Sequence, residues 1–181
     1  IYNTILSVVD PGDEVIIPAP YWVSYPHMVS MAQGESIVIP TTQENNFKIT
    51  AEQLEKAITP KTKVLIMCNP SNPTGAAYTP EELKSIADVV RKYDMYVISD
   101  EIYEQLVYDG FELVSFASFD DEIKAKTITV NGVSKTYAMT GWRIGFTAGP
   151  SDVINGINKI QSHSTSNAAS ISQYAALEAL T

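Results

Sequence analysis

The chain has 181 residues, 45% hydrophobic and 18% charged, which is typical of a soluble globular protein with its own core. Its net charge of −9 argues against nucleic acid or an anionic membrane as the main partner. No apolar run approaches the ~20 residues that span a bilayer, and no signal peptide is visible. The single cysteine, Cys68, cannot form an internal disulfide, so we expect a reducing, cytoplasmic compartment.

The first half of the chain alternates between helical and strand-like segments. A helix at the start is followed by a turn at 10–13, which contains proline and glycine. Gly34 is expected to end the second helix, and Thr50 is a good N-cap for the third. The predicted helices after the first are 22–33 and 51–58, and the predicted strands are 14–18, 36–39 and 63–68.

The second half continues the alternation. Thr79-Pro80-Glu81-Glu82 predicts a capped helix start, and that helix should run to about residue 93. The further predicted strands are 96–99, 126–130 and 143–148, and the further predicted helices are 150–164 and 168–180. This pattern predicts an α/β protein with three layers, α/β/α, around a mostly parallel sheet, in one domain.

Polar residues follow three of these strands at the point where each strand ends. Asn72, Asp100 and Lys135 come just after the strands at 63–68, 96–99 and 126–130. Open α/β sheets bind ligands along the edge formed by the carboxyl ends of their strands. The sequence therefore predicts a ligand site at this edge.

Arg143 lies eight positions after Lys135, and together they suit a carbonyl and a phosphate of one small molecule. A lysine amine is nucleophilic only when neutral, so a catalytic lysine needs a buried or cation-flanked position. An arginine stays charged and offers a planar fork that fits phosphate oxygens two at a time. The alternative explanation is a surface lysine that follows a strand.

Four motifs together carry a family resemblance that covers essentially the whole chain. They are Pro20-Tyr21-Trp22-Val23-Ser24-Tyr25-Pro26, Asn69-Pro70-Ser71-Asn72-Pro73-Thr74-Gly75, Val97-Ile98-Ser99-Asp100-Glu101-Ile102-Tyr103 and Ala138-Met139-Thr140-Gly141-Trp142-Arg143. With them the chain resembles the pyridoxal-phosphate enzymes of fold type I, and among these the class I and II aminotransferases. The aspartate aminotransferase branch is the most similar. The resemblance implies that residues 1–181 are the central part of the large cofactor-binding domain, truncated at both ends, with the small C-terminal domain absent.

The resemblance implies pyridoxal phosphate as the cofactor and Lys135, Asp100 and Tyr103 as catalytic residues. Lys135 would form the Schiff base and then move a proton between the substrate's α carbon and the cofactor's C4′. Asp100 would keep the ring nitrogen protonated, because an ion pair at about 4 Å in an effective dielectric of 20 is worth about 4 kcal/mol, or about three pKa units. Tyr103 and Asn72 would bind the phenolic oxygen of the ring.

The implied cofactor-binding set also includes an aromatic residue and phosphate ligands. Trp22 would stack on the ring and Arg143 would hold the phosphate. Many relatives carry a serine three residues before the lysine, where this chain has Gly132, so Ser134 is the candidate substitute. The complete set is Trp22, Asn72, Asp100, Tyr103, Ser134, Lys135 and Arg143.

The peptide bonds before Pro20 and Pro73 are implied to be cis. Considered alone, the site residues have simpler explanations: a helix N-cap for Asp100, a turn residue for Asn72, packing for Tyr103 and the core for Trp22. No metal site is expected, because His27 and His163 are isolated, and no P-loop or dinucleotide-binding pattern is present.

The function implied by the resemblance is transfer of an amino group between an L-amino acid, with aspartate favoured, and a 2-oxo acid such as 2-oxoglutarate. The full-length protein would be a homodimer. Two alternatives remain open. One is another pyridoxal-phosphate reaction at the same site, catalysed by a lyase or synthase. The other is an aminotransferase-like sensor domain of a transcription regulator, which a basic helix-turn-helix module would mark.

Overall fold

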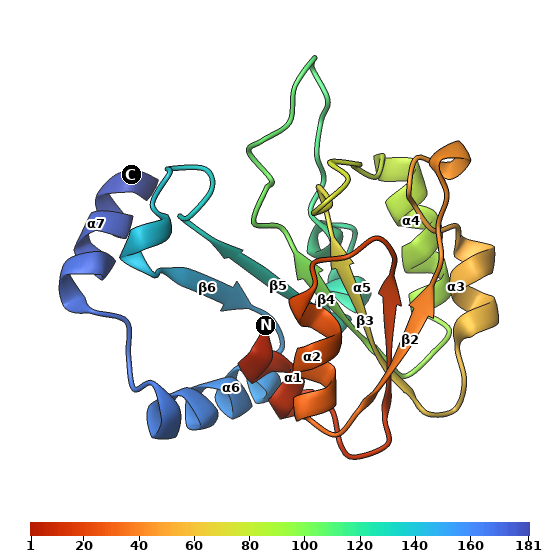
Figure 1. The fold of residues 1–181 in the computed structure, drawn as a ribbon, viewed down its shortest axis with the longest axis horizontal. Helices are drawn as coiled ribbons and strands as arrows, with labels where there is room; N and C mark the ends of the chain where they lie inside the picture. Colours follow the sequence, from red (N-terminus) through yellow and green to blue (C-terminus); the bar gives the residue numbers. More distant parts are fainter.

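The computed structural model describes residues 1–181, which form a six-stranded sheet between two layers of helices (Figure 1). The strand order is β2-β1-β3-β4-β5-β6. The first five strands are parallel, and β6 runs antiparallel to β5 at one edge. The strands are β1 (Glu14–Pro18), β2 (Glu35–Ile39), β3 (Thr62–Cys68), β4 (Tyr96–Asp100), β5 (Thr127–Gly132) and β6 (Gly145–Ala148). The predicted α/β class with a mostly parallel sheet is confirmed.

Six of the seven helices cover the two faces of the sheet. On one face lie α1 (Tyr2–Val8), α2 (Ser24–Met31) and α6 (Ser151–Ser164), and on the other lie α3 (Ala51–Ala57), α4 (Pro80–Val90) and α5 (Asp121–Lys126). Helix α7 (Ser170–Leu180) stands away from the sheet at the C-terminal end of the chain (Figure 1). Short 3-10 helices are η1 (Gln43–Asn45), η2 (Phe116–Ser118) and η3 (Thr140–Trp142). None of the helices combines the length and the apolar character needed to cross a membrane.

Successive side chains of the central strands point to opposite faces of the sheet, and this alternation produces one hydrophobic core on each face. In β3, Val64 and Ile66 pack against α1 and α2, whereas Leu65 and Met67 pack against α3 and α4. All four side chains are at most 2% exposed. Burying one such side chain is worth about 1.5–3 kcal/mol, so both faces of the sheet are stabilised by neighbours from the chain itself.

The two helices predicted from capping residues begin where expected. The Thr79 hydroxyl accepts from the Glu82 N–H at 3.3 Å, and the Glu82 carboxylate accepts from the Thr79 N–H at 2.8 Å. Thr50 and Gln53 form the same reciprocal pair at the start of α3. Each pair satisfies two backbone N–H groups at the start of the helix that have no backbone partner there.

Several predicted boundaries are wrong by two or three residues, including the end of α4, which lies at Val90 rather than at about 93. The helix expected at 22–33 is α2, which begins at Ser24 and ends at Met31. Its early end follows from Gln33, which adopts a left-handed conformation at φ 63° just before Gly34. The strand expected at 143–148 begins only at Gly145, because Arg143 also has a left-handed backbone, at φ 56°. A residue in that conformation cannot continue a strand.

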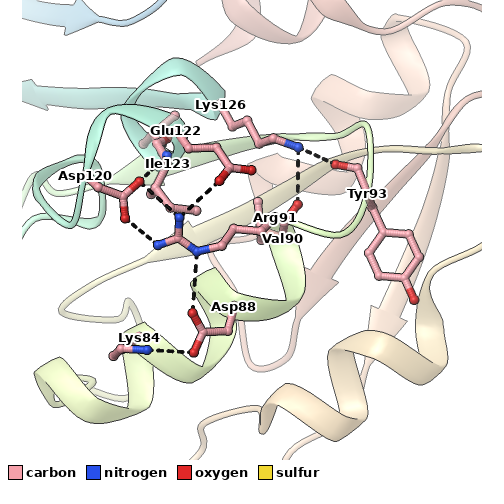
Figure 2. A network of polar contacts seen from close by, with 10 residues as sticks. Lys84, Asp88, Val90, Arg91, Tyr93, Asp120, Glu122, Ile123 and Lys126 are labelled. Carbon is pink, nitrogen blue, oxygen red and sulfur yellow. Dashed lines mark hydrogen bonds and ion pairs between the residues drawn. The ribbon is translucent and has the colours of Figure 1, made fainter.

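Helix α5 was missed, although its start carries a recognisable signal. The Asp120 carboxylate caps the helix by accepting from the Ile123 N–H at 3.0 Å. Acidic residues occupy the first turn and lysines the last, which complements the helix dipole. Figure 2 shows how α5 is joined to the end of α4: Arg91 contacts Asp120 and Glu122, and Lys126 donates to the backbone carbonyl of Tyr93.

Candidate functional site

A cavity of about 430 Å3 opens at the carboxyl ends of β3, β4 and β5. This volume lies in the range of small-molecule sites. All seven predicted site residues line this one cavity, although they come from four separate segments of the chain: Trp22, Asn72, Asp100, Tyr103, Ser134, Lys135 and Arg143. The structure thus brings the predicted residues together at this edge of the sheet, and a ligand site there, with the role of each residue in it, remains a prediction.

The loop after β3 is folded tightly, and it carries Asn72 to the cavity. The buried Asn69 side chain accepts from the Tyr78 N–H at 2.9 Å, which closes the loop. Within the loop, the Ser71 N–H donates to the Ala76 carbonyl at 2.8 Å. The expected cis peptide bonds before Pro20 and Pro73 are present, and a third precedes Pro70.

Asn72 and Tyr103 contact each other, as expected of a pair that binds one ligand atom. The Asn72 amide donates to the Tyr103 hydroxyl at 3.4 Å, a long and therefore weak hydrogen bond. Burial raises the pKa of Tyr103 above its ordinary value, so its hydroxyl remains protonated at neutral pH. The Lys135 Nζ atom lies 5.8 Å from the centre of the Tyr103 ring. A hydroxyl, an amide and an amine therefore meet on one side of the cavity.

Asp100 is the last residue of β4, and it is only 5% exposed. Its Oδ2 atom accepts from the Tyr25 hydroxyl at 2.6 Å, and its Oδ1 atom accepts from the Ile102 N–H at 3.4 Å. Burial raises the pKa of Asp100, and the hydrogen bond from Tyr25 opposes that rise. The simpler explanation, a helix N-cap, is wrong, because turns rather than a helix follow Asp100.

Tyr25 is a site residue that the sequence reasoning missed. It lies in α2 one turn after Trp22, it is 2% exposed, and its hydroxyl contacts Asp100. Burial, and then the charge of Asp100, raise the pKa of Tyr25, so the phenol stays neutral. Burial also raises the pKa of the neighbouring Cys68 thiol to about 12. Tyr25 and Cys68 therefore keep their protons at neutral pH, and the hydrogen bond from Tyr25 favours the ionised form of Asp100.

Trp22 lies at the edge of the cavity rather than in the core. Its side chain is 37% exposed, and its ring meets the Tyr25 ring edge to face, with 5.5 Å between centroids. Edge-to-face contact is a favoured arrangement of aromatic pairs. The core explanation for Trp22 is therefore wrong, and part of its ring surface faces the cavity.

The connection between β5 and β6 brings the two cationic residues to the same cavity. Lys135 is exposed, so the buried position expected of a nucleophilic lysine is not found in this chain. Arg143 lines the same cavity, and its Nη1 atom donates to the Thr140 carbonyl at 2.9 Å. This bond folds the guanidinium back over its own loop.

Gly132 explains why a serine is missing three residues before the lysine. A Cβ atom at this position would lie 2.9 Å from the Ile144 carbonyl oxygen and 3.1 Å from the Gly145 Cα. Both are backbone atoms of the neighbouring chain segment, so they cannot move aside cheaply. The close approach of β5 and β6 therefore requires glycine at 132 and leaves Ser134 as the hydroxyl that lines the cavity.

A family model described as aminotransferase class I and II matches residues 1–181. Similar proteins include an aspartate aminotransferase from Bacillus sp. (strain YM-2), 54% identical over 179 residues, which cover 99% of this chain and 46% of that protein. An aspartate/prephenate aminotransferase from Cereibacter sphaeroides (strain ATCC 17029 / ATH 2.4.9) is 52% identical over 181 residues, which cover 99% of this chain and 45% of that protein.

Solved structures agree with the sequence matches. The aspartate aminotransferase from Rhizobium meliloti is 44% identical with a TM-score of 0.97, and the match covers 99% of this chain and 45% of that one. An aromatic aminotransferase from Pyrococcus horikoshii is 43% identical with a TM-score of 0.96, covering 99% and 48%. The chain thus spans about half the length of the relatives that it matches.

Proposed function

Because this chain belongs to the family of class I and II aminotransferases, we propose that it forms the cofactor-binding core of a pyridoxal-phosphate-dependent aminotransferase. The amino donor that we favour is aspartate, and the acceptor is a 2-oxo acid such as 2-oxoglutarate. The observation that carries the proposal is the convergence of seven residues from four segments on one cavity. The names of the relatives support aspartate as the donor.

The groups that line the cavity fit the chemistry of pyridoxal phosphate. The cofactor has a flat ring, a basic ring nitrogen, a phenolic oxygen, an aldehyde and a phosphate. The cavity offers an aromatic ring, a buried carboxylate, an amide with a phenol hydroxyl, an amine, and a guanidinium with a hydroxyl. Each group of the cofactor therefore has a partner of complementary chemistry. When bound, the cofactor supplies an electron sink for bond breaking at the substrate's α carbon.

In this proposal three residues perform the chemistry. Asp100 binds the proton of the ring nitrogen, and its burial strengthens that ion pair. Lys135 would hold the cofactor through its aldehyde carbon, with loss of water. Once the substrate's amine has displaced it, the freed Lys135 amine would take the proton from the substrate's α carbon and deliver it to the cofactor's C4′. Tyr103, with its hydroxyl protonated, donates to the phenolic oxygen and keeps the ring in one orientation.

The remaining residues hold the cofactor in place. Trp22 covers one ring face, and Asn72 reaches the phenolic oxygen from the loop after β3. Arg143 and Ser134 bind the phosphate, since a planar guanidinium contacts two phosphate oxygens at once. Ser134 takes the position of phosphate ligand because the approach of β6 leaves no room for a side chain at Gly132.

The whole protein is proposed to be longer than this chain. Residues 1–181 would be the central part of the large domain, with further segments supplying the arginine that binds the substrate's α-carboxylate. The exposed apolar side chains Trp142, Phe146 and Tyr174 support this, because surfaces of this kind mark contacts with other protein parts. We propose a homodimer in the cytoplasm as the working form.

The proposal is tested by labelling the full-length protein. Borohydride reduction in the presence of pyridoxal phosphate, followed by peptide mapping, should place the pyridoxyl group on Lys135. A Lys126→Ala variant is a matched control, because Lys126 bonds to the backbone of α4 away from the cavity. A label on another lysine would overturn the proposal. Prephenate should be assayed beside 2-oxoglutarate, because one relative is named for both aspartate and prephenate.

A further inference from the structure

The hydrogen bond between Tyr25 and Asp100 joins α2 to the end of β4. Tyr25 has no role among the residues that are proposed above to bind the cofactor. Asp100 accepts one short hydrogen bond, from Tyr25 at 2.6 Å, and one long one, from the Ile102 N–H at 3.4 Å. An O–H···O⁻ distance of about 2.5–2.7 Å is typical of a strong, charge-assisted bond. Tyr25 is thus the main fixed partner of this carboxylate.

Resting on the function proposed above, we propose that Tyr25 is a positioning residue that acts on the cofactor through Asp100. Its hydroxyl fixes the orientation of the carboxylate and favours the ionised form. Oδ2 of Asp100 is occupied by the short bond from Tyr25, whereas Oδ1 accepts only the long bond from Ile102 and keeps a lone pair for the ring nitrogen. Tyr25 itself makes no contact with the reacting atoms in this arrangement.

The surroundings explain why Asp100 needs such a partner. A carboxylate that is only 5% exposed is stable in its charged form only if hydrogen bonds replace the lost water. The neighbouring Cys68 does not supply one, because its Sγ atom donates to the Pro70 carbonyl at 3.2 Å. Replacing Tyr25 by phenylalanine would therefore leave a buried carboxylate with one weak backbone donor.

A simpler alternative is that Tyr25 only packs α2 against the sheet. The chain offers a matched residue that separates the two explanations. Tyr78 is 4% exposed, and its hydroxyl accepts from the backbone N–H of Ile49 at 2.9 Å. Tyr25 and Tyr78 are equally buried, and both hydroxyls are hydrogen-bonded, but only Tyr25 contacts a carboxylate.

The test compares Tyr25→Phe and Tyr78→Phe in the full-length protein. Dissociation constants are measured by absorbance titration with pyridoxal phosphate and with an analogue whose ring nitrogen is replaced by carbon. Tyr25→Phe should weaken binding of pyridoxal phosphate roughly tenfold, as expected for loss of a hydrogen bond to a charged group. It should leave binding of the analogue unchanged, because the analogue makes no ion pair with Asp100. Tyr78→Phe should affect both ligands equally.

A second variant makes the test independent of folding defects. In an Asp100→Asn background, adding Tyr25→Phe should cause little further loss, because Tyr25 acts through the charge that is already removed. Equal losses for both ligands, no loss for either, or additive losses in the double variant would each overturn this inference. The function proposed above is judged separately, by the label on Lys135 in the unmodified protein.

Discussion

The α3–α4–α5 layer and the α6–α7 end of the chain are stabilised in different ways. Helices α3 and α4 begin with reciprocal caps, and α3, α4 and α5 pack into a core of 16 buried residues. Neither α6 nor α7 has a side-chain cap, and α7 buries only Ser172 and Ala176. Its apolar residues at spacings of three, from Ile171 to Leu180, are all more than half exposed.

This difference shows which part of the molecule is complete by itself. The capped layer finds all its packing partners within 181 residues, whereas α7 presents an apolar stripe that nothing in the chain covers. The candidate site combines buried and exposed residues: Asp100 at the end of β4 is 5% exposed, whereas Lys135 and Arg143 are exposed in the connection between β5 and β6. We therefore expect the exposed part of the site to limit what residues 1–181 can do alone.

The largest expected effect is on activity. With added pyridoxal phosphate, residues 1–181 alone should show only weak absorbance from cofactor bound to the protein. They should not measurably convert aspartate and 2-oxoglutarate, whereas the full-length protein should be active. The physical reason is positioning, since well-oriented reactants account for about 7–11 kcal/mol of a barrier. Circular dichroism of the 181-residue chain is the control for folding. Robust turnover by that chain would contradict the proposed division.

The two regions should also differ in their response to the same substitution. Leu83 in α4 is 1% exposed, and Leu177 in α7 is 57% exposed. In residues 1–181, Leu83→Ala should lower the free energy of unfolding by about 2–5 kcal/mol, because it leaves a cavity. Leu177→Ala should change it by less than about 0.5 kcal/mol. Both values follow from urea denaturation.

The same pair sharpens the comparison in the full-length protein. If other segments cover α7 there, Leu177→Ala should be more destabilising than it is in residues 1–181. Leu83→Ala serves as the reference, because its surroundings are complete in both. An unchanged effect at Leu177 would show that α7 is exposed in the whole protein as well.

Features set by neighbouring residues were predictable from the sequence. The bounds of β1 are the predicted 14–18, because an apolar run lies between a Pro-Gly turn and a proline. The caps at Thr50 and Thr79 depend on residues three positions apart, and both were found. The convergence of the site residues followed from topology alone, because parallel strands end at one edge of the sheet.

Features set by tertiary packing were not predictable. The Tyr25–Asp100 bond joins residues 75 positions apart, and it depends on how α2 lies on the sheet. The left-handed backbone of Arg143 shortened a strand that its sequence pattern favoured. The need for glycine at 132 became clear only from the approach of the β6 backbone. In each case the deciding neighbour is distant in sequence or is a backbone atom.

A smaller effect is expected at the caps. Thr79→Ala removes the hydroxyl that accepts from the Glu82 N–H, so it should lower the free energy of unfolding by about 1 kcal/mol. Ser170→Ala at the start of α7 is the control, because no side-chain cap is present there, and it should have almost no effect. If the two variants lowered the free energy of unfolding by the same amount, the cap would contribute nothing to the stability of α4.

The smallest effect is expected at the charged contacts between α4 and α5 (Figure 2). Arg91 lowers the pKa of Asp120 to about 2, below its ordinary value in an unfolded chain of about 3.9. A carboxylate whose pKa is lower in the folded state stabilises that state at pH values above its pKa in the unfolded chain. This stabilisation is lost as the pH falls, here between about pH 4 and pH 2.

The variant Asp120→Asn keeps an oxygen that can cap α5, so it removes mainly the charge. Its melting midpoint should lie slightly below that of the wild type at pH 7, and the difference should shrink below pH 4. High salt should also reduce the difference at pH 7, because Asp120 and Glu122 are exposed and Arg91 is only partly buried. A difference that persisted unchanged to pH 3 and in high salt would mean that Asp120 acts through its cap and not through Arg91.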